Sequence, residues 1–114
     1  QSRSSAASDV YKRQIKYYKR ILTIDSKHIN ARLELAKLYI KESSEMVNIL
    51  NTTDFTKNPD LDINKLMKAR NMLWESAKDV LKEGLKINPK NSYFNQEIKN
   101  LKELKKTNRN TPYN

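Results

Sequence analysis

The chain lacks residue types that whole classes of protein require. Its 114 residues include no cysteine, one glycine and three prolines. Without cysteine there can be no disulfide, zinc–thiolate site or thiol catalysis, and we expect an intracellular (cytoplasmic) protein. So few turn residues disfavour an all-β fold and favour an all-α fold. No apolar run approaches the roughly 20 residues of a membrane helix, so we expect no membrane partner.

Residues for catalysis or metal binding are equally scarce. The only histidine is His28, in a predicted turn, and one imidazole makes neither a triad nor a metal site. Three side chains are spaced as at the start of a calcium-binding loop, namely Asp60, Asp62 and Asn64. That loop needs glycine and glutamate where Lys65 and Asn71 stand. We therefore predict no catalytic residue, no metal, no cofactor and no enzymatic activity.

Basic residues are plentiful. Lysine and arginine number 23 against 13 acidic residues, a formal net charge of +10. Such a charge favours acidic partners, nucleic acid included. An AT-rich genome also produces this abundance of lysine, asparagine and isoleucine. Tyr17 and Tyr18 alternate with basic residues as in single-stranded nucleic-acid sites, but we expect Tyr18 to pack in the core.

The first fourteen residues have a separate interpretation. The stretch Ser4–Gln14 resembles the direct translation of a transposase sequencing adapter with its mosaic end. We interpret residues 1–14 as adapter-derived, so that the natural sequence enters near Ile15 as a fragment. Val10 and Gln14 still fall at helical spacing with Tyr17 and Ile21, so a helix can extend through these residues.

Helical periodicity organises the remainder. Apolar residues at positions 15, 18, 21, 22 and 24 predict a first helix ending at Ile24. A second helix is expected from residue 29 or 30 to about Leu50, with a separate short helix over 46–50 as the alternative. A loop over 51–61 and a cap at Asp60 or Asp62 precede a third helix ending at Ile87, before Pro89. Asn91 or Ser92 caps the fourth, and residues 107–114 are predicted to be a disordered tail.

One stretch, Ala77–Phe94, reads as two helices joined by a tight break at Asn88–Pro89. Small residues at Ala77 and Gly84 would let the helices approach closely, with large apolar residues beside them. The earlier stretch Gln14–His28 repeats this pattern less completely.

The pattern resembles the tetratricopeptide repeat (TPR) family over most of residues 15–106. The family's packing positions are occupied here by Leu35, Ala36 and Tyr39 on one helix and by Ala77, Leu81, Gly84 and Pro89 on the next. The resemblance implies antiparallel helical hairpins stacked as a short α-solenoid, in a fragment of a longer repeat protein. The spacing between its two copies exceeds the usual period, which implies an insertion around 42–72.

The resemblance also implies a function, a protein–protein interaction module that binds a peptide or partner helix on its concave face. The residues expected to contact that partner are Asn30, Glu34, Lys37, Lys41 and Asn95. The alternative is a helical-repeat protein that binds RNA or other nucleic acid through its basic surface.

Overall fold

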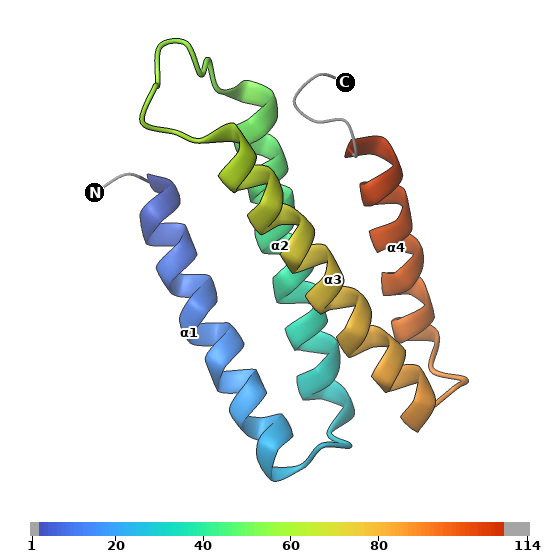
Figure 1. The fold of residues 1–114 in the computed structure, drawn as a ribbon. Helices are drawn as coiled ribbons and strands as arrows, with labels where there is room; N and C mark the ends of the chain where they lie inside the picture. The colour runs from blue at the N-terminus through green and yellow to red at the C-terminus, as the bar shows by residue number, and fades with distance from the viewer. Residues whose placement is uncertain (1–2, 109–114) are drawn as a thin grey trace.

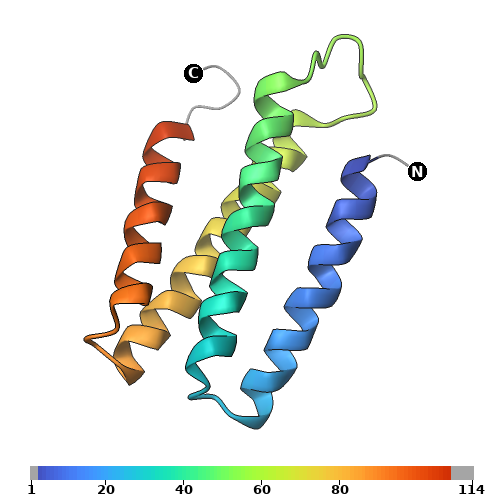
Figure 2. The same ribbon diagram turned by 180° about the vertical axis from the view of Figure 1, so that it is seen from behind.

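The computed structural model describes residues 3–108, and the side chains of residues 9–108, as an all-α arrangement. The helices are α1 (Arg3–Ile24), α2 (Ile29–Thr52), α3 (Ile63–Ile87) and α4 (Ser92–Asn108). Consecutive helices run antiparallel, and α2 packs against the other three (Figure 1). From behind, α2 lies in front of α3, with α1 on one side and α4 on the other (Figure 2). The predicted all-α fold of antiparallel hairpins is therefore confirmed.

The molecule is a thin slab. Its extents are 47 × 30 × 16 Å and its radius of gyration is 15.2 Å. A compact domain of this length would have a radius of gyration of about 13 Å. The elongation follows from the packing scheme, because α1 and α4 each lie beside α2 and do not close the structure into a bundle.

Side chains and short turns set the helix boundaries. His28 Nδ1 accepts a hydrogen bond from the Ala31 backbone N–H at 3.0 Å and so caps α2. Asp62 caps α3 by accepting from Lys65 N at 3.2 Å, which decides between the two predicted caps. Asn91 Oδ1 accepts from the N–H groups of Tyr93 and Phe94 at the start of α4. Each oxygen or nitrogen satisfies a donor that the first helical turn leaves free.

The second helix is longer than predicted. It continues to Thr52, so residues 46–50 belong to α2 and form no separate helix. The connecting loop is 53–62, because Asn51 and Thr52 still belong to α2. Ser43 and Ser44 could weaken this helix by competing for backbone hydrogen bonds, but both donate their hydroxyls to the Ile40 carbonyl, at 2.6 and 3.0 Å. Those bonds run along the helix, so the serines are accommodated without a break.

The ends of the chain differ from the predicted boundaries. The first helix extends back to Arg3 and includes adapter-like residues, whose origin stays a prediction. Ile15, Tyr18 and Leu22 pack against the core as the apolar periodicity predicted, and Tyr11 is buried on the same side. Val10, Gln14 and Tyr17, which share helical spacing with Ile21, are exposed. Ile24, expected on the apolar face, is 82% exposed. At the other end, Thr107 and Asn108 belong to α4, and the rest of the predicted tail lies outside the described residues.

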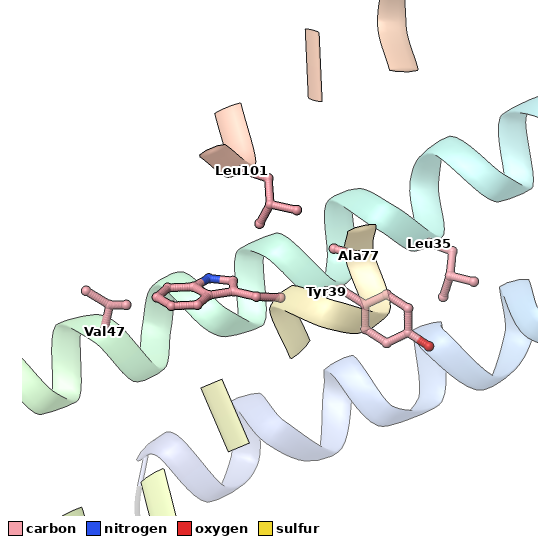
Figure 3. Packing of buried hydrophobic residues seen from close by; sticks show 6 residues of the cluster. Leu35, Tyr39, Val47, Ala77 and Leu101 are labelled. Atoms are coloured by element: carbon pink, nitrogen blue, oxygen red, sulfur yellow. The ribbon is translucent and has the colours of Figure 1, made fainter. Parts of the chain in front are cut away.

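Two apolar clusters along α2 make up the core. The first is built from Leu35, Tyr39, Val47, Trp74, Ala77 and Leu101. Figure 3 shows three of its α2 residues with Ala77 of α3 and Leu101 of α4 directed toward them. The second contains Leu33, Ala36, Leu81 and Phe94, and Ile40 and Val80 pack against both clusters. Ala36 of α2 packs with Leu81 of α3, and Ala77 of α3 packs with Leu35 of α2, since small side chains allow close helix contact.

The residues expected to pack the repeat are buried with one exception. Leu35, Ala36, Tyr39, Ala77, Leu81 and Gly84 are all buried. Pro89 is exposed in the turn after α3, where Asn88 N–H bonds the Gly84 carbonyl at 2.9 Å. Pro89 therefore helps to end α3 and contributes nothing to the core.

Candidate interaction surface

A polar stripe follows the side of α2 that faces away from α3. Asn30, Glu34, Lys37 and Lys41 recur every three or four residues, so all four lie on one side of the helix. Asn30, Lys37 and Lys41 are exposed and Glu34 is half-buried. Four of the five predicted partner-contact residues therefore share one surface, which we call the α2 face.

Charge on the α2 face is partly paired. Lys37 Nζ lies 3.8 Å from Glu34 Oε1, and both side chains are about half exposed (46% and 47%). An exposed pair of this kind contributes about 0.5 kcal/mol or less, so a ligand can replace it at little cost. Among the described side chains Lys41 has no acidic partner within ion-pair distance. The cationic end of the face is therefore at Lys41 and its amide end at Asn30.

The fifth predicted residue, Asn95, lies elsewhere. It lines a groove between α3 and α4 together with α3 residues such as Lys82 and Leu85. Sequence reasoning assigned Asn95 to the same face as Asn30, because it treated α2 and α4 as equivalent helices of successive repeats. In the structure its side of α4 borders α3, so Asn95 and the α2 face belong to two separate surfaces.

The groove between α3 and α4 is a surface feature that sequence reasoning missed. It has a volume of about 520 Å³. Its lining consists of Lys78, Lys82, Leu85, Asn95, Ile98, Leu101, Lys102 and Lys105. The sequence carried a signal for it, because the lysines are spaced by four residues on α3 and by three on α4. That signal becomes readable only once the two helices are known to be adjacent.

An acidic group is buried near α1 at the edge of the α2 face. Glu42 is 9% exposed, and burial raises the pKa of its carboxyl, with Lys12 opposing the rise and Glu45 adding to it. Tyr11 donates its hydroxyl to Glu45 Oε1 at 2.6 Å. Burial, followed by this hydrogen bond and the nearby carboxylates, raises the pKa of Tyr11 to about 12. These groups tie α1 to α2 and are structural.

A buried cation lines a second hollow, which shares Lys105 with the groove. Arg70 is 2% exposed, and its guanidinium carbon lies 4.6 Å from the centre of the Trp74 ring. The guanidinium donates to Asn71 Oδ1 from Nε and Nη2 and to the Asn108 carbonyl from Nη1. Burial lowers the pKa of Arg70, because the charged form loses hydration. Neutral acceptors and an aromatic face hold this cation in place.

Within residues 3–108 no three His, Cys, Asp or Glu side chains gather as metal ligands would. None of the described helices is long and apolar enough to cross a membrane. His28, the lone histidine, serves as the α2 cap.

Comparisons with protein-family models, with curated proteins and with solved structures returned no match.

Proposed function

We propose that this chain is a protein–protein interaction module of the TPR type that binds a peptide or partner helix along the α2 face. The observation that carries the proposal is the shared placement of Asn30, Glu34, Lys37 and Lys41 on an uncovered side of α2. From Asn30 to Lys41 the helix rises about 16 Å, the length of roughly five extended residues. A peptide of that length could place an acidic side chain at Lys41 and an amide or hydroxyl at Asn30.

The packing register supports the family resemblance. Ala36 and Ala77 are fully buried in the α2–α3 region, and Gly84 is buried against α4. Antiparallel hairpins stacked in this way leave one side of the central helix open, and that side carries the polar stripe. Such a module binds partners through surface side chains and requires no catalytic group.

Peptide selection followed by calorimetry tests the proposal. A random peptide library displayed on phage is selected against the chain, and the affinity of the best peptide is measured by titration calorimetry. The quadruple variant N30A/E34A/K37A/K41A should weaken binding at least about tenfold, because several contacts of about 0.5–1 kcal/mol each are lost. The matched control is N64A/E83A/K68A/K86A, which removes the same residue types from exposed positions of α3. Equal affinity of the wild-type chain and the α2-face variant would contradict the assignment.

RNA binding is the second candidate. Four lysines line the groove between α3 and α4, and the chain carries a net charge of +10. If all four contacted phosphates of a single strand, the logarithm of the affinity would fall against the logarithm of salt concentration with a slope of about −3. Absence of binding to oligouridine at low salt would remove this candidate.

A further inference from the structure

We propose that the groove between α3 and α4 is a docking site for an acidic amphipathic α-helix of a partner protein. The groove lies apart from the α2 face, so the inference adds a second binding surface and states the chemistry of its partner. It shares with the proposed function only the premise that the chain binds proteins.

The floor of the groove suits an apolar helix face. Leu85 of α3 and Ile98 of α4 are half-buried, and Leu101 beneath them is 3% exposed. These aliphatic side chains meet between two antiparallel helices, where a third helix could insert a ridge of its own side chains. The lining spans residues 78–85 on α3 and 95–105 on α4, which correspond to about 10 and 15 Å of helix. Two to three turns of a partner helix would fill this length.

The rims of the groove are cationic. Lys78 and Lys82 line the α3 side, and Lys102 and Lys105 line the α4 side. Glu75 is the acidic residue nearest these rims, with Nζ–Oε distances of 3.9 Å to both Lys78 and Lys105. Lys82 and Lys102 make no ion pair among the described side chains. The groove thus presents an apolar floor between two rows of positive charge, and a helix with an apolar stripe flanked by Glu or Asp complements both features.

The other acidic residues of α3 and α4 do not neutralise the lysines of the groove. Asp79 lines a different hollow, on the side of α3 that carries Asn64 and Met67. Glu83 pairs with Lys86 at 3.2 Å. On α4, Glu97 is half-buried and Glu103 is exposed, and neither lines the groove.

Alternative occupants fit less well. A second copy of the chain carries a net charge of +10 and would be repelled by the lysines. Residues 109–114 of the chain itself contain an arginine and no acidic residue, so they offer no complement. A single nucleic-acid strand binds best where aromatic faces stack on its bases, whereas the described lining of the groove consists of aliphatic side chains, lysines and Asn95. The observations therefore favour an acidic helix over RNA.

The test uses a designed helical peptide of about 14 residues, long enough for the groove, with leucines at i, i+3, i+4 and i+7 and glutamates on both flanks. Its fluorescein-labelled form is titrated with the full chain at low salt and followed by anisotropy. A scrambled peptide of equal composition controls for non-specific charge attraction. Amide shifts in the ¹⁵N–¹H spectrum of the wild-type chain then locate the peptide independently of any variant.

The decisive comparison reverses charge on each surface. K82E/K102E should lower the affinity for the acidic peptide roughly tenfold or more, because two attractions become repulsions. K37E/K41E makes the same change in net charge on α2 and should leave the affinity within about twofold. A peptide carrying lysines in place of its glutamates should bind K82E/K102E more tightly than it binds the wild-type chain. The amide shifts should fall on α3 and α4.

Three results would overturn the proposal: equal losses in the two variants, equal binding of the scrambled peptide, or amide shifts that fall outside α3 and α4. Displacement of the peptide by oligouridine at lower concentration than unlabelled peptide would assign the groove to nucleic acid instead. None of these results bears on the α2-face variant N30A/E34A/K37A/K41A, so the two proposals fail separately.

Discussion

The aromatic ring of Phe94 lies directly on Gly84. A Cβ atom built on Gly84 would come within 2.8 Å of Phe94 Cζ and 2.9 Å of Cε1 and Cε2. Phe94 is fully buried in the cluster that joins α2, α3 and α4. The only glycine of the chain is therefore at the position on α3 that the Phe94 ring of α4 covers, and its lack of a side chain makes this packing possible.

Replacing Gly84 by alanine tests this contact. In a free helix the change stabilises by about 1 kcal/mol. Here the added methyl would overlap a buried ring, at a cost of about 1–3 kcal/mol for overpacking. We expect a net loss of about 1 kcal/mol in the free energy of unfolding, measured by urea denaturation followed by circular dichroism. In an F94L background the same change should be neutral or stabilising, and an equal loss in both backgrounds would disprove the steric explanation.

Arg70 offers a test of how a buried cation is tolerated. Arg70→Lys keeps the charge but loses the planar group that stacks on Trp74 and bonds both Asn71 and the Asn108 carbonyl. We expect a loss of about 2 kcal/mol in unfolding free energy. Arg70→Met removes the charge and keeps most of the volume. We expect it to lower the unfolding free energy less than Arg70→Lys does, because no charge has to be desolvated on folding and this offsets the lost hydrogen bonds. A larger loss for methionine than for lysine in urea denaturation would show that the charge itself is stabilising.

Tyr11 makes the free energy of unfolding depend on pH in the alkaline range. Its pKa is about 12 in the folded chain against 10.0 for the free side chain, so folding favours the protonated phenol. This contribution is fully present below pH 10 and is lost as pH rises toward 12. At pH 8 we expect Tyr11→Phe to cost about 1 kcal/mol through the lost bond to Glu45. The difference between the two proteins should shrink above pH 10, and a constant difference between pH 8 and pH 12 would refute the linkage.

Removing the charge of Glu42 should stabilise the folded chain at neutral pH. Burial raises the pKa of its carboxyl, so the folded chain favours the protonated form. That contribution is present below the ordinary glutamate pKa of 4.5 and is lost as pH rises through the folded pKa. Glu42→Gln should therefore stabilise the chain at pH 7, by an amount that declines as pH falls toward 4. Thermal denaturation at both pH values measures this. A destabilised variant at pH 7 would mean that attraction to Lys12 outweighs burial.

Much of the candidate surface could be predicted from sequence because it depends on one helix. Asn30, Glu34, Lys37 and Lys41 share a face through the helical repeat alone, and no neighbour had to be known. Asn95 could not be placed in this way. Its environment depends on which side of α4 contacts α3, and Phe94 and Leu101 decide that by packing inward. The groove lysines were missed for the same reason, because they come from two helices.

Local sequence signals determined the helices themselves. Apolar residues at helical spacing, the break at Asn88–Pro89, and caps at Asp62 and Asn91 act within a few residues of one another, so they can be read from the chain in order. Tertiary structure decided what no local signal carries. It turned α1 so that Tyr11 packs inward while Val10 is exposed, and it buried Arg70 against Trp74. It also brought the α3 and α4 lysines to one groove, because the packing energy of a side chain depends on neighbours that are distant in sequence.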